Sequence, residues 1–501
     1  MRVPSPKRGR YRPPGYDTPL CPARAGCSNP GFRCENKNSL LYAHPMPDAH
    51  SSSGSKLTVV SLLAYAAPMV AINFSLVLFM SYVNKYAIDV LLVPATAMGL
   101  IFGIGRLWDA VTDPMAGLWS DRTQHRLGRR RPWILASSLP VALFGLMVWA
   151  PPESLSTPEL IAWMTVAVFG FNTAMTIFLT PHQALGAELT LDHHSVSRVF
   201  AFRQAAGYVG MIGSLVFAIG YLMTAPDRRE SARELAIYSG IAIIVFNTLS
   251  VLLLREPTEN RRRGGGSSIG VARDVWKNSH ARRLLIMIFI EHTGSGASMV
   301  VAPFLMEYVV GLPGKIGDIF LFYVGSSLLS LPLWLRISRA IGKKNTWMIG
   351  LIIGMTGYFS LFFVGKGDLR WMQMVVSLTG ACSACGTLIG SSMLADVIDA
   401  DELETGERKE GAYYSAYTFL FKASSGVMAM ITGFVLAGTG FVPNAADQSE
   451  RVGLAIRSLN GLVPFATIFI GAFILARFKL TEEVHTEIRA KLDARKRNEA
   501  G

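Results

Sequence analysis

Long apolar runs recur along almost the whole chain, and they constrain its fold more than any other feature. Half of the 501 residues are hydrophobic and only 17% are charged, against about 25% in a typical soluble protein. The runs lack the period-two alternation of barrel strands. About twelve of them can cross ~30 Å of hydrocarbon as α-helices, and the sequence therefore predicts an all-α membrane protein. These runs span 58–82, 93–118, 133–151, 159–184, 199–223, 234–254, 284–309, 316–338, 347–365, 371–394, 412–438 and 455–477.

The distribution of Lys and Arg predicts the orientation and argues against nucleic acid as a partner. The formal net charge is +13, but the basic residues lie in short clusters beside the apolar runs, which is the positive-inside pattern. Three such stretches, 120–133, 255–283 and 336–347, fall on one side of the predicted membrane. We therefore expect a multi-pass protein of the plasma (inner) membrane with both termini in the cytoplasm.

Two similar motifs indicate an internal repeat. LGRRRPW at 127–133 follows the second run, and IGKKNTW at 341–347 follows the second run after a central Gly/Arg-rich linker. Six helices, a basic loop and six more helices are typical of the major facilitator fold, with the substrate near the midplane between two bundles. The alternative is two unrelated basic turns that share a tryptophan by chance.

The repeat divides the chain into five predicted parts. They are a disordered N-terminal extension, a six-helix bundle, a cytoplasmic central loop, a second six-helix bundle and a cytoplasmic amphipathic tail, at 1–56, 57–255, 256–283, 284–478 and 479–501. The extension is rich in Pro, Ser, Arg and Gly and lacks a sustained apolar run. The tail repeats an apolar residue every four positions, at Leu480, Val484, Ile488 and Leu492, and we expect it to lie along the inner surface.

Three charges lie inside the second apolar run. Asp109 and Asp113 are one helical turn apart, and Arg106 shares their face. Each charge costs about 2.5–3.5 kcal/mol at mid-bilayer, and two carboxylates this close repel unless a cation lies between them. Pro114 also frees a carbonyl oxygen one turn earlier. A shared H⁺ or Na⁺ is therefore expected, the alternative being an Arg106–Asp109 ion pair that only fixes helix packing.

Lys422 is a further intramembrane charge, about ten residues into the eleventh run and therefore roughly 15 Å deep. It needs a counter-charge, and the aspartate pair in the other half is the best candidate. Lys422 would then compete with the coupling cation or bind an anionic or hydroxyl-rich substrate; a static salt bridge between the halves is the alternative. Glu291 and His292 form another polar cluster, which would either bind substrate or be a satisfied interior pair.

Charged runs near the predicted cytoplasmic face form a candidate gate. A basic run follows the second apolar run, and an acidic run that extends through Glu402, Glu404 and Glu407 precedes the eleventh. Pairs between them would close the inner face, although single exposed pairs contribute little and these are otherwise solvated loop charges. The candidate gate residues are Arg126, Arg129, Arg130, Arg131, Glu188, Asp192, Arg198, Asp396, Asp399, Asp401 and Arg408.

Several motifs in order resemble the glycoside–pentoside–hexuronide:cation symporter family of the major facilitator superfamily. The resemblance covers about 57–476. The motifs are RLWDAVTDP at 106–114, LGRRRPW, TIFLTPHQALGAELTLD at 176–192, LADVIDADELETGERKEGAYYS at 394–415, the Lys422 segment and GTGFVPN at 438–444.

The resemblance implies a site for Na⁺, Li⁺ or H⁺ centred on Asp109 and Asp113 and helped by Thr176. Thr112 replaces an asparagine ligand of the family pattern. On the substrate side, Asn73 and Leu179 replace two sugar-binding aspartates, and Gln183 replaces a stacking tryptophan. Arg203 is nearest to the family's helix-five arginine. Taken together with the intramembrane polar residues described above, the candidate substrate residues are Lys422, Arg106, Asn73, Gln183, Glu291, His292 and Arg203.

The expected function is cation-coupled secondary active symport by alternating access, most simply of a sugar or glycoside. Superfamily relatives that carry lysolipids make a lysolipid or other amphiphile the alternative. A membrane-embedded enzyme is an alternative from a different functional class, but the sequence has no HExxH, GxSxG or P-loop pattern. We expect no cofactor beyond the coupling cation, a small-molecule substrate, a lipid bilayer around the protein and a monomer.

Overall fold

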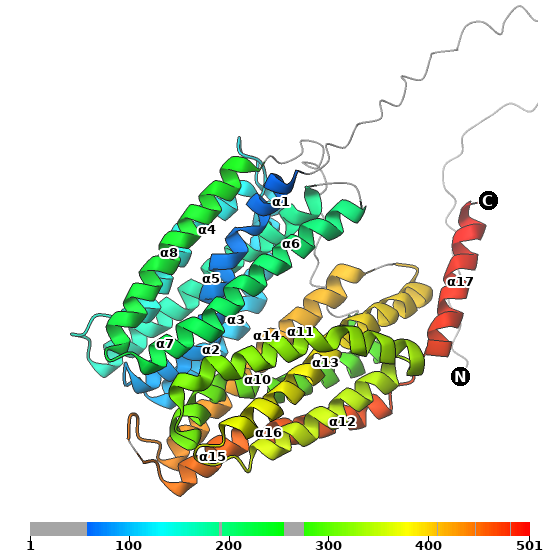
Figure 1. Cartoon of the computed structure of the whole chain (residues 1–501). Helices are drawn as coiled ribbons and strands as arrows, with labels where there is room; N and C mark the ends of the chain where they lie inside the picture. The colour runs from blue at the N-terminus through cyan, green and yellow to red at the C-terminus, as the bar shows by residue number, and fades with distance from the viewer. Residues whose placement is uncertain are drawn as a thin grey trace, which may run out of the picture. The chain divides into compact units, whose positions relative to one another are not determined.

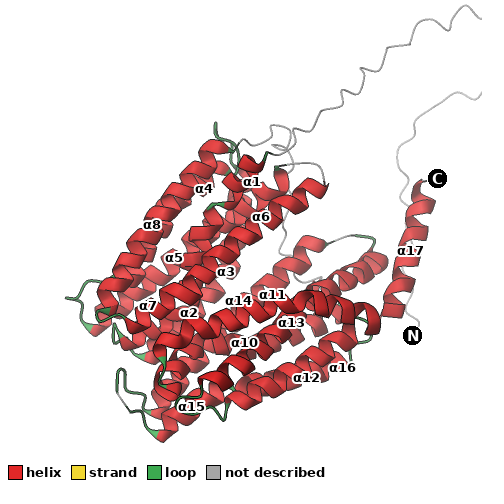
Figure 2. Ribbon diagram, viewed as in Figure 1, coloured by secondary structure: helices red, strands yellow, loops and turns green. Residues whose placement is uncertain are grey.

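The computed structural model describes residues 58–189, 193–254, 275–407, 409–445, 447–480 and 482–500, and every regular element in these ranges is helical (Figure 2). The predicted extension 1–56 and most of the predicted loop 256–283 lie outside the described residues. The first half contains α1 Val59–Ala66, α2 Pro68–Asp89, α3 Ala95–Arg122, α4 Arg131–Trp149, α5 Thr157–Glu188, α6 His193–Ile212, the π-helical η1 Gly213–Ala218, α7 Ile219–Thr224 and α8 Arg228–Leu253.

The second half begins after the central loop. Its elements are α10 Ser279–Leu305, the π-helical η3 Met306–Val310, the short η4 Pro313–Lys315, α11 Ile316–Ile341, α12 Lys343–Leu361, α13 Leu369–Thr405, α14 Glu410–Thr439, α15 Glu450–Asn460 and α16 Leu462–Ala476. A final helix, α17 Glu482–Ala500, follows in the tail. In Figure 1 the first half runs from blue to green, and the second from yellow-green to red.

Each predicted apolar run becomes a helical rod, which confirms the fold predicted from the runs. Among the described residues, 10 helices have the length and hydropathy to cross a membrane. The two remaining rods are α3, whose charges lower its hydropathy, and α12. Local signals set several ends: Asp227 and Asn278 cap the starts of α8 and α10, and Gly406 and Gly440 end α13 and α14 in the left-handed conformation.

Each half packs around its own helices. In the first half, α4 lies against α5 and α8, α3 against α5, and α2 against α6. In the second half, α13 lies between α11 and α12, and α10 packs on α14 and α16. The buried core along these contacts is apolar, with Phe79, Phe171, Phe304 and Trp347 at 1% exposure or less. The halves are therefore two helical bundles, as the repeat predicts.

The main contact between the halves is α3 against α14, and glycines allow it. A Cβ at Gly433 of α14 would lie 2.4 Å from the carbonyl oxygen of Ala95, and one at Gly99 of α3 would lie 2.8 Å from that of Ala429. Small residues are what bring membrane helices into such close contact. At the same end, η1 and α7 of the first half contact α11 and η4 of the second. The halves thus touch at the end of α3 and α14 that carries Ala95 and Gly433. We call the other end, with Arg129–Arg131, the basic end.

The tail forms a helix as predicted, and it packs on α13. Leu480 and Leu492 are buried at 6% and 2% exposure, whereas Val484 is 41% exposed. The apolar stripe is therefore only partly buried. Polar contacts with α13, described below with the predicted gate, also hold α17.

The glycine contact generates a first prediction. We expect Gly433→Ala to destabilise the protein by about 1–3 kcal/mol, because the new Cβ overlaps the backbone of α3 and forces the two helices apart. Thermal unfolding of the purified protein in detergent measures this. Gly438→Ala is the matched control, since a Cβ there meets nothing within 4 Å. Equal unfolding temperatures for the two alanine variants would contradict the close contact.

Candidate functional site

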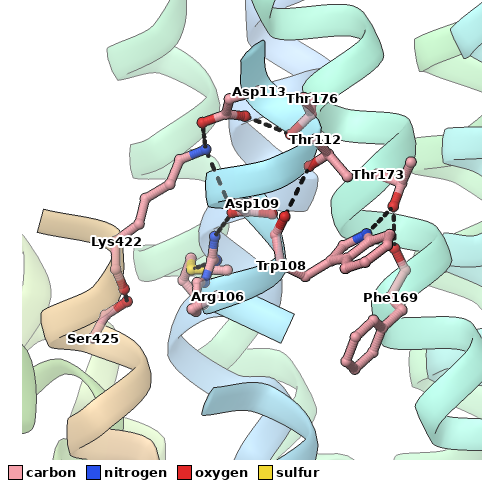
Figure 3. Close-up of polar contacts among 11 residues, drawn as sticks. Arg106, Trp108, Asp109, Thr112, Asp113, Phe169, Thr173, Thr176, Lys422 and Ser425 are labelled. Carbon is pink, nitrogen blue, oxygen red and sulfur yellow. Dashed lines mark hydrogen bonds and ion pairs between the residues drawn. The ribbon is translucent and has the colours of Figure 1, made fainter. Parts of the chain in front are cut away.

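One face of α3 carries the predicted acidic pair into the interior. Asp109 and Asp113 lie one turn apart, with side-chain exposures of 3% and 32%. Pro114 lies inside the helix. Figure 3 shows both carboxylates pointing to the same side of α3, toward α14. The spacing seen in the sequence therefore produces a two-carboxylate cluster at the contact between the halves.

Lys422 of α14 bridges the two carboxylates (Figure 3). Its Nζ lies 2.7 Å from Oδ2 of Asp113 and 3.4 Å from Oδ2 of Asp109, and its side chain is 22% exposed. This is the counter-charge that the depth of Lys422 requires. Lys422 of the second half thus pairs with two carboxylates of the first half across the interface between the bundles.

Arg106 supplies a second cation on the same face. Its Nη1 donates to Oδ2 of Asp109 at 3.1 Å, its Nη2 contacts Sδ of Met80, and the guanidinium lies 5.3 Å from the ring centre of Phe102. The expected Arg106–Asp109 ion pair therefore exists beside the Lys422 bridge. Two cations face two carboxylates, so the cluster is neutral without a mobile ion. The expectation that Lys422 competes with a mobile cation for the two acids stays a prediction.

Oxygen atoms around the acids form a set that suits a small cation. Thr176 of α5 donates its hydroxyl to Oδ1 of Asp113 at 2.8 Å. Oδ1 of Asp109 is buried without a hydrogen-bond partner. Thr112 instead donates to the carbonyl of Trp108 in its own helix at 3.4 Å. The described residues contain no cluster of three or more His, Cys, Asp or Glu side chains that could hold a metal; hydroxyl and carbonyl oxygens would have to complete a cation site here.

Sequence reasoning missed one polar residue beside this cluster. Asn172, one turn before Thr176 on α5, is 3% exposed, and its Nδ2 is buried without a hydrogen-bond partner. It packs against Gly105, where a Cβ would lie 3.0 Å from that nitrogen. The sequence did contain a signal for Asn172, because it lies four residues before Thr176 in an apolar run and therefore on the same helical face.

The other first-half residues expected to bind substrate lie on α2, α5 and α6. The Asn73 amide lies against Gly207 of α6. Gln183 is exposed. Arg203 lies near Tyr65 and His182, and its Nε is buried without a hydrogen-bond partner. The charge cluster between α3 and α14 consists of Arg106, Asp109, Asp113 and Lys422. Among the described residues, no hydrogen bond or ion pair links this cluster to Asn73, Gln183 or Arg203.

Glu291 and His292 of α10 point in different directions, so they are not a satisfied pair. Glu291 is 8% exposed and lies against Gly386 of α13, where a Cβ would be 3.2 Å from its Oε1. No ion pair or hydrogen bond of its carboxylate to another described residue is found. His292 packs edge-on against Phe421 and Tyr417 of α14, with ring centres 5.0 Å and 6.4 Å away. His292 therefore lies beside the Lys422 segment, and Glu291 lies inside the second half.

The basic run of the predicted gate pairs within its own half. Arg129 and Arg130 bind Glu188 of α5 at 2.7 Å and 3.0 Å, and Arg130 also pairs with Asp121. Arg131 donates to the carbonyl oxygens of Leu127 and Val251. Arg126 and Arg198 are exposed, and Asp192 and Arg408 lie outside the described residues.

The acidic run pairs within the second half and with its tail helix, a role that the sequence reasoning did not anticipate. Asp396 binds Lys343 at 2.7 Å. Asp399, whose side chain is 2% exposed, contacts His485 and Arg489 of α17, both at 2.9 Å. Asp401 accepts a hydrogen bond from Asn278. The described pairs thus differ from the expected cross-half gate because the halves meet at the opposite end in this conformation.

A charged network that was missed entirely lies at that opposite end. The Lys85 side chain is fully buried and pairs with Asp89 and, at 2.9 Å, with Glu307 of η3. Glu307 also binds Arg228 at 2.9 Å, and the Tyr308 hydroxyl donates to Asp89 at 2.8 Å. We call these five residues the α2–η3 network. It ties α2 and α8 of the first half to the second, and it was missed because α2 continues past 82, the predicted end of its run.

This network generates a second prediction. Glu307→Gln removes the carboxylate with which Lys85 and Arg228 both pair. Breaking a buried ion pair costs about 3–5 kcal/mol of stability. We expect the halves to separate at this end. A cysteine introduced at Ala429, which is 2% exposed at the α3–α14 contact, should then react faster with an impermeant thiol reagent, the native cysteines having been replaced.

Glu230→Gln is the matched control for this experiment. It makes the same change on α8 at an exposed carboxylate that pairs only with Arg233 among the described residues. Equal labelling rates in the two variants would show that the α2–η3 network does not hold the halves together.

Comparisons with known proteins place this arrangement in a family. The model of the MFS/sugar transport protein family matches residues 64–482, which is most of the chain. The chain is 27% identical to an uncharacterized symporter of Synechocystis, with 90% of this chain and 99% of that protein covered. It is 24% identical to a glucuronide carrier protein homolog of Escherichia coli, over 87% and 96%. It is 25% identical to the sodium-dependent lysophosphatidylcholine symporter 1-B of Danio rerio, over 92% and 95%.

The fold is also found among solved structures. The crystal structure of a mutant of the nucleoside transporter NupG matches with a TM-score of 0.61 and 14% identity, over 84% of this chain and 99% of that one. At this identity the match shows the fold alone. The family match, the relatives and the two helical bundles agree: the chain belongs to the MFS/sugar transport protein family, and is a multi-pass membrane symporter of the major facilitator superfamily.

Proposed function

We propose that the protein is a cation-coupled symporter of a sugar or glycoside that works by alternating access. The observation that carries this proposal is the Lys422 ammonium of the second half, which lies within 3.4 Å of both Asp109 and Asp113 of the first. Coupling can be carried by a group that responds to both the cation and the substrate. Lys422 is suited to this role because it lies at the contact between the two bundles.

Charge balance suggests the order of events. With Arg106 and Lys422 in place the acid pair is neutral, so a further cation has no net attraction to it. A cation that enters must displace Lys422, because like charges a few Å apart repel by about 4 kcal/mol in a protein-like dielectric. Na⁺ would take oxygens of Asp109, Asp113 and Thr176, whereas H⁺ would neutralise Asp113, the more exposed acid.

The displaced Lys422 would then be available to the substrate. An ammonium group can donate three hydrogen bonds to sugar hydroxyls or a sugar carboxylate. Arg106, His292 and Glu291 are further candidates for contacts with the substrate, as are Asn73, Gln183 and Arg203. By linkage, the substrate raises the affinity for the cation by the same factor as the cation raises the affinity for the substrate.

Alternating access would exchange one set of contacts between the halves for another. The α2–η3 network and the α3–α14 glycine contact join the halves here, which corresponds to a carrier closed on the side opposite the basic end. In the other state, we propose that Arg129–Arg131 meet the acidic run that begins at Asp396. By the positive-inside pattern the basic end is cytoplasmic, and we propose a monomer in the plasma membrane with both termini in the cytoplasm.

Two observations bear on the substrate. The description of the family and the name of the Escherichia coli relative favour a sugar. The Danio rerio relative is named for lysophosphatidylcholine, and Leu179 stands where the family pattern has an acid. A lysolipid or similar amphiphile is therefore the second candidate, with the same cation site.

A third prediction tests the coupling site. Asp113→Asn should abolish uphill accumulation in proteoliposomes under an imposed Na⁺ or H⁺ gradient, because the site loses its more accessible carboxylate. Labelled glucuronide, other glycosides and lysophosphatidylcholine are the substrates to assay. Asp318→Asn is the control, since Asp318 is 45% exposed on α11 beside Lys315. Undiminished accumulation by the Asp113 variant would remove this residue from the site.

A fourth prediction tests the competition. Lys422→Gln removes the ammonium from the acid pair, so the cation should bind at least about tenfold more tightly in the absence of substrate. Cation-dependent thermal stabilisation of purified protein measures this affinity. Lys315→Gln, at a 54% exposed position, is the control. A wild-type affinity in the Lys422 variant would mean that the lysine and the cation do not compete.

A further inference from the structure

A basic cavity lies away from the charge cluster, at the basic end of the second half. Its volume is about 820 Å³, and it is formed by the start of α10, the start of α12 and the end of α16 with the residues after it. The residues that matter here are Arg283, Lys344, Phe473, Arg477, Phe478 and Lys479. We call it the α16 cavity.

The charge in this cavity is not compensated. Its lining contains four basic side chains and no carboxylate, and none of the four forms an ion pair with another described residue. The nearest acid along the chain, Glu482, lies against Gly342 at the start of α12 and is not among the lining residues. Four uncompensated cations in one concavity favour an anion with several acceptor oxygens, and phosphate is such an anion.

Two of the basic residues are held by local contacts, and two remain available. The Lys344 ammonium donates to the carbonyl oxygens of Ala476 and Phe478, at 2.9 Å and 2.8 Å, as lysines often do at helix ends. The Arg477 guanidinium lies 4.0 Å from the ring centre of Phe473. Arg283 and Lys479 are exposed. Lys344 and Arg477 therefore form part of the cavity wall, whereas Arg283 and Lys479 can reach a ligand.

An apolar strip leads from the cavity along α16. Phe469, Ile470 and Phe473 are 58%, 45% and 52% exposed, on a helix that is apolar apart from Thr467. Exposed phenylalanines on a membrane-spanning helix face the acyl chains of the bilayer. A ligand with a phosphate head and an acyl chain can therefore contact both the basic cavity and the apolar strip. A free phosphate can contact only the cavity.

We infer that the α16 cavity binds the phosphate headgroup of an anionic phospholipid from the surrounding leaflet. Basic pockets between membrane helices on the positive side of a protein are suited to such headgroups. This site is separate from the coupling site and needs no transport event. It would anchor the end of α16, and through Lys344 the start of α12, to the membrane surface.

The test compares lipid binding by two double variants of the full chain. Arg283→Gln with Lys479→Gln removes the two available cations. Arg282→Gln with Arg336→Gln removes two exposed cations outside the cavity, one of them the direct neighbour of Arg283. Native mass spectrometry of detergent-purified protein titrated with phosphatidylglycerol measures retained lipid, and thermal unfolding confirms that both variants are folded.

We expect the cavity variant to bind phosphatidylglycerol at least tenfold more weakly than the wild type, and the control variant to be unchanged. Phosphatidylcholine should bind weakly to all three. Equal phosphatidylglycerol binding by the two variants would overturn the assignment, as would equal binding of the two lipids by the wild type. Displacement of phosphatidylglycerol by millimolar inorganic phosphate would instead identify a site for free phosphate and would also overturn it.

Discussion

The cost of placing charge inside a bilayer governs this structure. Asp109 and Asp113 cannot face lipid, so α3 must turn them toward protein, and Lys422 on α14 is under the same constraint. Each half therefore carries a charge that only the other half satisfies. Because these contacts are made by side chains and by glycine-lined backbone, they can be broken and remade without disturbing the core of either bundle.

Much of the fold and the centre of the site could be predicted because their signals are strong in one sequence. An apolar run of membrane length has few alternatives to a helix, and ionised residues inside such a run stand out. The cluster of Arg106, Asp109, Asp113 and Lys422 was found in this way. What the sequence alone could not decide was whether the Arg106–Asp109 pair and the Lys422 pairs form together. In the structure both are present, so the mobile cation that we propose would have to compete with Lys422.

Other parts could not be predicted because their residues look ordinary in sequence. Lys85, Arg228 and Glu307 lie near the ends of apolar runs, where charges are common, and only the folded chain shows them as one network. The partners of Asp399 depend on where the tail helix docks. The α16 cavity combines residues from three helices. Each of these features needs tertiary contacts that neither hydropathy nor spacing encodes.

The most direct measurement is an experimental structure at saturating coupling cation. We predict that Lys422 Nζ moves out of salt-bridge range of Asp113, and that the cation, or a proton inferred from a shortened carboxyl contact, takes its place among Asp109, Asp113 and Thr176. If Lys422 keeps its present contacts while the cation binds elsewhere, the competition between the lysine and the cation does not exist.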